Sequence, residues 1–126
     1  MLVIRDEERL IEGAWESAQV QTQLPAAMAK SFFAHSGPMR GHFDNRRSFH
    51  RYYLRDKALL TRGESLLGVY TKDVSRQGIC LLSPLQLFPK ERVELRLPNG
   101  SVYQLQVVRC RRECDHCFDC GTRFTV

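Results

Sequence analysis

Residues 92–111 read RVELRLPNGSVYQLQVVRCR, and this stretch carries a clear signal of the fold. Its centre, Pro98-Asn99-Gly100, is a strong hairpin turn, because asparagine and glycine tolerate the backbone angles of tight turns. The flanking runs, 92–97 and 102–111, are rich in valine, leucine and other residues found in strands. The stretch therefore predicts an antiparallel β-hairpin.

Short β-rich runs continue on both sides of this hairpin. Four more of them, separated by turn signals, lie at residues 52–61, 66–72, 78–82 and 117–126. Six short strands with tight turns and no long helix among them predict a small antiparallel barrel or sandwich. The fold class is thus mainly β, and we assign residues 41–126 to this β domain.

Residues 1–40 have a different composition and predict a helical extension. Apolar residues recur at helical spacing between residues 5 and 20, and the acidic residues near the start suit the helix dipole. A second helical stretch is expected at residues 25–34, and Ser36-Gly37-Pro38 ends it. The large apolar residues of the extension, which either form a partner-binding surface or pack on the β domain, are Trp15, Phe32 and Phe33.

The composition indicates a cytoplasmic protein that binds something anionic. The 126 residues are 43% hydrophobic and 26% charged, which is typical of a soluble globular domain. The net charge of +5, concentrated between Arg40 and Lys57, favours anionic partners. No run approaches the ~20 apolar residues that span a bilayer, and no signal-peptide pattern is present, so we expect no membrane insertion. Five cysteines make a poor disulfide framework and indicate a reducing compartment.

Two arginines four residues apart, Arg47 and Arg51, lie just before the first expected strand, and Arg46 precedes them. A guanidinium never loses its charge and offers a planar fork of donors, so it can bind phosphate through two hydrogen bonds. It can also bind the O6/N7 edge of guanine or stack on a base. The spacing alone means little in a basic chain, because Arg51 and Arg55 show it too.

The segment Asp73-Val74-Ser75-Arg76-Gln77-Gly78 joins two expected strands. An ionised Asp73 can accept hydrogen bonds from N1 and N2 of guanine, and Ser75 offers a hydroxyl to a base or a phosphate. Gly78 permits a positive φ and a close approach of the backbone. The same residues also fit an ordinary turn, in which Asp and Ser bond to their own backbone and Gly closes the loop.

Together the two segments resemble the PilZ domain family, which pairs an RxxxR motif with (D/N)xSxxG at a later strand connection. Residues 47–51 and 73–78 match both motifs in full, in order and at a suitable separation. Phe49 inside the first motif looks typical of the family, and residues 120–124 (CGTRF) resemble its last strand. The resemblance covers residues 45–126.

The resemblance implies a six-stranded antiparallel β-barrel that binds cyclic di-GMP. In this family the arginines contact phosphates and guanine faces, the acidic residue and the serine address a guanine edge, and the glycine lets the backbone pass close to the nucleotide. The residues of this chain to which the resemblance assigns the nucleotide are Arg46, Arg47, Arg51, Asp73, Ser75 and Gly78.

The resemblance also indicates stoichiometry and partners. An arginine at the position of Arg46 often accompanies a stacked pair of nucleotides, so two nucleotides for each protein are expected. A one-domain chain has no output module, so we expect a protein partner such as a kinase or a receiver domain, acting in motility, biofilm formation or signalling. Nucleotide binding would order the arginine segment and change that interface.

Four cysteines crowd into the last seventeen residues, at Cys110, Cys114, Cys117 and Cys120. Cys114 and Cys117 form a short CxxC of the kind that binds zinc, and they face each other if residues 115–116 form a hairpin tip. Cys120 then pairs near Arg111 and points to the other face of the sheet. We therefore expect small apolar core residues and no metal, with a zinc or redox-sensitive pair at Cys114 and Cys117 as the alternative.

The sequence shows no catalytic residues and does not predict an enzyme. The histidines are scattered, and neither a glycine-rich phosphate loop nor an activated serine is present. Two other functions stay open beside the nucleotide receptor. One is a basic barrel that binds single-stranded nucleic acid, although DNA is not the expected partner, and the other is a zinc-dependent interaction module.

Overall fold

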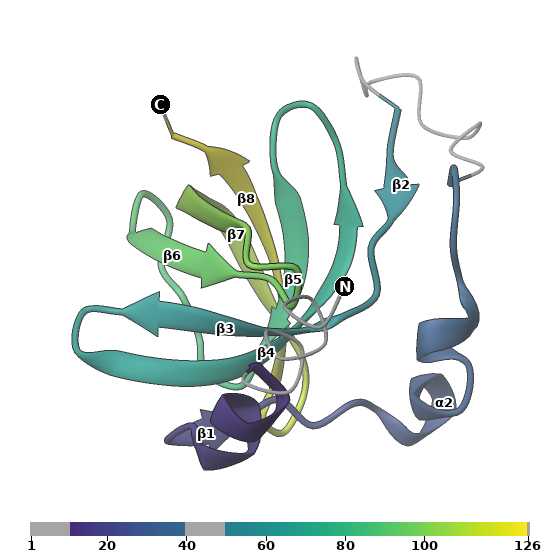
Figure 1. Cartoon of the computed structure of the whole chain (residues 1–126), viewed down its shortest axis with the longest axis horizontal. Helices are drawn as coiled ribbons and strands as arrows, with labels where there is room; N and C mark the ends of the chain where they lie inside the picture. Colours follow the sequence, from purple (N-terminus) through teal and green to yellow (C-terminus); the bar gives the residue numbers. More distant parts are fainter. Residues whose placement is uncertain (1–10, 40–49, 126) are drawn as a thin grey trace.

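The computed structural model describes residues 11–39 and 50–125, and its centre is a closed β-barrel (Figure 1). Six strands follow one another round the barrel in the order β4-β3-β6-β7-β8-β5, and β5 pairs back with β4. Every neighbouring pair is antiparallel, so the predicted six-stranded antiparallel barrel is confirmed. The strands are β3 (Lys57–Arg62), β4 (Ser65–Val74), β5 (Ile79–Ser83), β6 (Arg92–Arg96), β7 (Val102–Cys114) and β8 (Cys117–Phe124).

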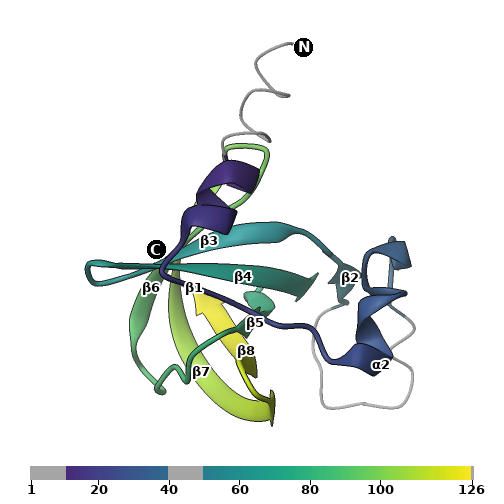
Figure 2. The same cartoon turned by 90° about the horizontal axis from the view of Figure 1, so that it is seen from below.

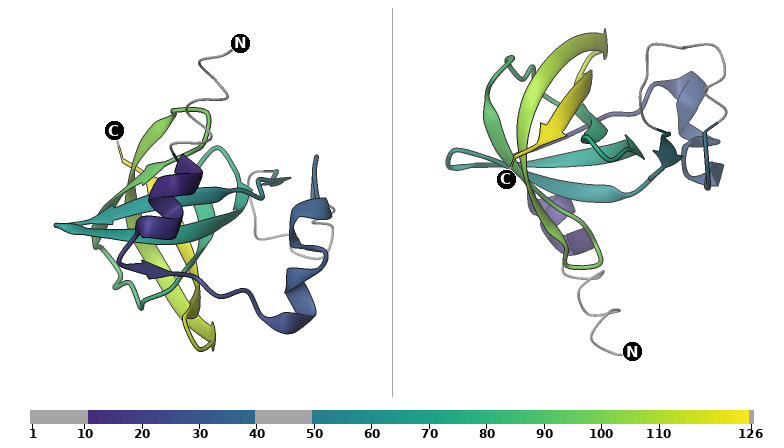
Figure 3. Two further views of the ribbon diagram at one scale, coloured as in Figure 1. Left: turned by 60° about the horizontal axis from the view of Figure 1, so that its bottom comes forward. Right: turned by 90° about the horizontal axis from the view of Figure 1, so that it is seen from above.

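The hairpin predicted at residues 92–111 joins β6 to β7. Leu95 pairs with Tyr103 across it, and Gly100 in the turn has a φ of 89°, which favours glycine. Strands β7 and β8 then form a longer, curved hairpin (Figure 3). Around the whole barrel, alternate residues of the strands point inward and form the apolar core. The fully buried residues of this core include Leu60, Val69, Leu81, Leu95, Leu105 and Val107.

Strand β4 has four neighbours, which together cover both of its edges. Strand β3 pairs with its first half, and β2 (Tyr52–Tyr53) continues along the same edge at its end. Strand β5 pairs with its second half on the other edge, where β1 (Val20–Gln21) fills the remaining part as a parallel strand. Covering both edges removes the unpaired backbone groups that promote aggregation.

Two expected element boundaries are wrong, and the pairing with β4 explains both. The run at 52–61 is not one strand, because residues 54–56 lie opposite only two residues of β4 and the extra residue interrupts the pairing. In the extension, the described helix covers only residues 11–17, since residues 20–21 leave the helical path to form β1. The beginning of the helix expected at 5–20 lies outside the described residues.

The rest of the extension is a short helix and a single turn of 3₁₀-helix. These are α2 (Ala26–Ala29) and η1 (Phe32–Ala34), within the second stretch for which helix was expected. Figure 2 shows residues 11–39 running along one side of the barrel, from the first helix past β1 to α2. No helix in the described ranges is long and apolar enough to cross a membrane.

The extension packs on the outside of the barrel. The indole of Trp15 donates a hydrogen bond of 2.9 Å to the carbonyl of Val69, and a Cβ at Gly68 would lie 2.9 Å from the same ring. Trp15 and Phe32 are buried in a second apolar cluster with Tyr70 and other residues of the barrel wall. Of the three large apolar residues of the extension, only Phe33 is exposed to solvent, at 52%.

Candidate functional site

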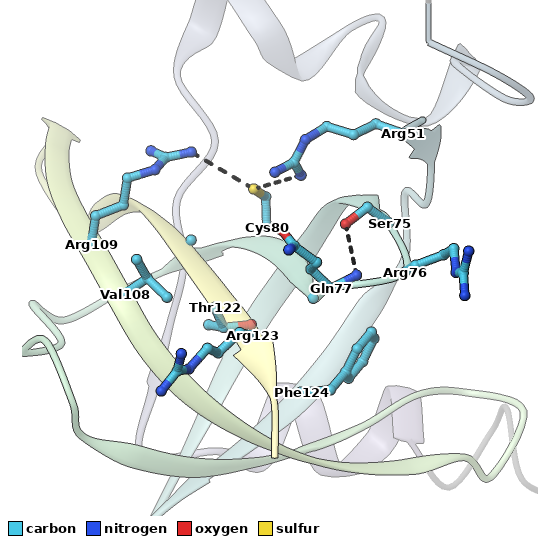
Figure 4. Close-up of a pocket in the computed structure, with 12 residues that line it drawn as sticks. Arg51, Ser75, Arg76, Gln77, Cys80, Val108, Arg109, Thr122, Arg123 and Phe124 are labelled. Carbon is cyan, nitrogen blue, oxygen red and sulfur yellow. Dashed lines mark hydrogen bonds between the residues drawn. The ribbon is translucent and has the colours of Figure 1, made fainter. Parts of the chain in front are cut away.

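A pocket of about 620 Å³ lies on the outer surface of the barrel, between the β4–β5 loop and strands β7 and β8 (Figure 4). This volume is within the range of small-molecule sites. Among the described residues, four that line the pocket are charged and none of these four is acidic, so the pocket attracts anions. They are Arg51, Arg76, Arg109 and Arg123.

Arg51 is fixed at the pocket wall by an ion pair with Asp73. Its Nη1 lies 2.5 Å from Oδ1 of Asp73, whose side chain is only 7% exposed. Arg51 comes close to Asp73 because the next strand, β2, pairs with β4 at Tyr53 and Asp73. Burial acts to lower the pKa of Arg51, but the neighbouring Cys80 and Asp73 raise it overall, so the guanidinium stays charged. The structure thus joins one residue of each predicted motif.

Ser75 adopts the turn structure that the sequence left open. Its backbone N–H donates to the carbonyl of Gly78 at 2.9 Å, and its hydroxyl oxygen accepts a hydrogen bond of 3.2 Å from the N–H of Gln77. Both Ser75 and Gly78 line the pocket. The loop therefore presents them to the pocket from a closed four-residue turn.

Of the two properties noted for Gly78, the structure uses the close backbone approach. Its φ is not positive, so the left-handed conformation that glycine permits is not adopted here. A Cβ at this position would lie 1.9 Å from the carbonyl oxygen of Thr122 and 2.6 Å from Cα of Arg123. Only glycine allows the start of β5 to pass so close to the backbone of β8.

The pocket residues that were not identified from the sequence as ligand-binding include Cys80, Arg109 and Arg123. Cys80 lies between two guanidinium groups, 3.3 Å from Nη1 of Arg51 and 3.9 Å from Nη2 of Arg109. Burial, followed by the charge of Asp73, raises the pKa of the Cys80 thiol, so it is a neutral acceptor here. The guanidinium of Arg123 donates to the side-chain oxygen of Gln106 at 2.8 and 3.0 Å.

Strand alternation from the turn at residues 115–116 could have placed Arg123 on the outer face. The same alternation does not predict where the Arg109 side chain points, because an irregularity in the pairing of β7 changes its direction. Arg46 and Arg47, the other two arginines expected at the site, lie outside the described residues.

The four cysteines at the end of the chain form two pairs on opposite sides of the β7–β8 hairpin. Cys114 pairs with Cys117 next to the expected tip at residues 115–116 and joins the outer cluster. Cys120 pairs with Cys110, not Arg111, because β7 has an irregularity between residues 112 and 114, and their sulfur atoms are 3.0 Å apart. Within residues 11–39 and 50–125, no three potential ligands gather as a metal site would require.

The geometry defines a small β-barrel with an arginine-lined pocket on its outer face. Comparison with models of protein families identifies the family of this barrel. The family model described as PilZ domain matches residues 45–126, which is more than half of the chain, so the chain belongs to the PilZ domain family. PilZ domains are receptors for cyclic di-GMP rather than enzymes. No curated protein matches the chain.

Proposed function

We propose that this chain binds cyclic di-GMP in the arginine-lined pocket and, once loaded, changes its interaction with a partner protein. The observation that carries the proposal is the pocket itself, where Arg51 of the first motif and Ser75 and Gly78 of the second line one cavity. A cyclic dinucleotide offers two phosphates and two guanines, and arginines bind both kinds of group. Arg46 and Arg47 would extend this set, and Arg46 would favour a second, stacked nucleotide.

Asp73 has two functions in this proposal. Through their ion pair Asp73 orients Arg51, which reduces the entropy that the guanidinium loses when it binds a phosphate. With nucleotide present, its carboxylate and the hydroxyl of Ser75 address a guanine edge, which an adenine nucleotide cannot match. Asp73 and Ser75 together therefore support a preference for guanine.

Backbone pairing connects the site to the extension. The N–H of Met39 donates to the carbonyl of Arg51 at 2.8 Å, and the N–H of Tyr53 donates to the carbonyl of Gly37 at 2.9 Å. Movement of Arg51 on binding would therefore be transmitted to residues 37–39. We therefore extend the proposal to a cytoplasmic adaptor, whose surface at residues 37–39 would change on binding and be read by a kinase or a receiver domain in motility, biofilm or signalling pathways.

Calorimetry with cyclic di-GMP tests the ligand. We expect micromolar or tighter binding by the wild type and a loss of at least about tenfold in Arg51→Ala, because hydrogen bonds to charged groups contribute ~1.5–3 kcal/mol. Absence of binding by the wild type would refute the proposal.

Competition tests the alternative ligand. A single-stranded oligonucleotide that displaces cyclic di-GMP and binds more tightly at low salt would favour the nucleic-acid function instead. A pulldown with and without nucleotide then tests the partner. Recovery of the same proteins under both conditions would contradict the adaptor function.

A further inference from the structure

Strand β7 has a β-bulge at the pocket. Val107 pairs with Thr122 and Arg109 pairs with Gly121, so Val108 has no partner on β8. A bulge of this kind redirects the side chains around it. Val108 and Arg109 both line the pocket, although neighbours on a regular strand would point to opposite faces.

The residue opposite Arg109 leaves space for its side chain. A Cβ at Gly121 would lie 3.1 Å from Nε, 3.2 Å from Cγ and 3.3 Å from Cζ of Arg109, closer than ordinary van der Waals contact. With a side chain at residue 121, the arginine would have to shift by a few tenths of an ångström to lie across β8. Its guanidinium extends over that strand toward Cys80 on β5 (Figure 4).

Arg51 and Arg109 approach Cys80 from opposite sides of the pocket (Figure 4). The thiol is a poor acceptor and remains neutral, so it does not compensate either charge. Asp73 pairs with Arg51, whereas no carboxylate within the described residues forms an ion pair with Arg109. Arg109 therefore has donors that are free to bind an anion placed over Cys80.

We infer that Arg109 is a further nucleotide-binding residue, which contacts a phosphate of the ligand from the side of the pocket opposite Arg51. The inference rests on the proposed function and adds a contact outside the two sequence motifs. The chemistry is that of an arginine fork on a phosphodiester, with charge-assisted hydrogen bonds. Because the side chain lies on a barrel strand, its position is set by the barrel itself.

Calorimetry with cyclic di-GMP on the full chain tests the inference. We expect Arg109→Ala to raise Kd by about 10- to 100-fold. Arg109→Lys, which keeps the charge without the fork, should lose less. The matched control is Arg111→Ala, on the same strand but paired with Glu113 outside the pocket, which should change Kd by less than about twofold. Thermal unfolding of each variant separates a local effect from loss of the fold.

A double-mutant cycle with Gly121→Ala gives a second measurement. The new methyl group would displace the Arg109 side chain, so Gly121→Ala alone should also weaken binding. It should add little to Arg109→Ala, since the contact is then already absent. If the wild type binds cyclic di-GMP and Arg109→Ala binds it with the same Kd, the inference is wrong and the proposed function stands. If the wild type itself does not bind, both are wrong.

Discussion

The ion pair between Arg51 and Asp73 allows one perturbation to test the fold and the site together. Two unit charges about 4 Å apart attract each other by about 4 kcal/mol at an effective dielectric constant near 20, and desolvation offsets part of this. Removing one partner of a fully buried pair costs about 3–5 kcal/mol. Because the Arg51 side chain is 21% exposed, water can reach the carboxylate that is left behind. We therefore expect Arg51→Ala to lower the free energy of unfolding by about 2 kcal/mol.

The assay is urea unfolding of Arg51→Ala, Asp73→Asn and the double variant, followed by the fluorescence of the single tryptophan. The double variant should lose less stability than the sum of the two single variants, by about 1 kcal/mol or more, because the two residues share one interaction.

Nucleotide affinity measured on the same proteins connects stability with function. Both single variants should bind cyclic di-GMP more weakly. The control is Arg62→Ala, whose guanidinium is about as exposed as that of Arg51 and pairs with the more exposed Glu91 outside the pocket. This variant should lose some stability but no affinity. Strict additivity in the cycle, or a loss below about 0.5 kcal/mol for Arg51→Ala, would refute the argument that this pair holds the site.

Three further predictions concern the packing of the barrel and its extension. Gly78→Ala should destabilise the protein by about 3 kcal/mol in urea unfolding, because its methyl group would clash with the backbone of β8. The control Gly13→Ala, in open space on a helix, should stabilise the protein by about 0.5–1 kcal/mol. Equal effects of the two substitutions would contradict the close contact at Gly78. Trp15→Phe should cost about 1–3 kcal/mol by leaving the carbonyl of Val69 without its donor, and an unchanged melting temperature would show that the extension does not pack there. Burial, followed by the neighbouring Cys114, raises the pKa of Cys117 to about 12, so the folded state retains a proton that the unfolded state loses near pH 9. In reducing buffer Cys117 should therefore lower the free energy of unfolding by about 1.4 kcal/mol for each pH unit between about pH 9 and about pH 12, in addition to the effect of the other buried thiols. Cys117→Ala should remove this part of the slope, and a variant with the same slope as the wild type would contradict the assignment.

The barrel was predictable because its signals are local. The turn at Pro98-Asn99-Gly100 and the runs on either side of it specify a hairpin whatever the rest of the chain does. The tip at residues 115–116 followed from the same reasoning. The two motifs of the family could also be found in the sequence, since a family resemblance needs only residue types and spacing.

The features that could not be predicted depend on contacts between distant segments. Residues 20–21 leave their helix because one edge of β4 is open beside them, and no local propensity shows this. A close backbone approach at Gly78 was expected, but the sequence could not show that the neighbouring backbone is that of β8. The direction of Arg109 depends on the unpaired Val108, and a bulge does not show in a pattern of alternating residues.

The covering of both edges of β4 has a practical consequence for the choice of boundaries in a truncated form of the protein. The family match begins at residue 45, but β1 and the buried residues Trp15 and Phe32 come before it. A fragment made of residues 45–126 would expose part of the β4 edge together with the apolar surface around Tyr70. We expect such a fragment to self-associate, so the shortest well-behaved unit for biophysical work extends at least back to the helix at residues 11–17.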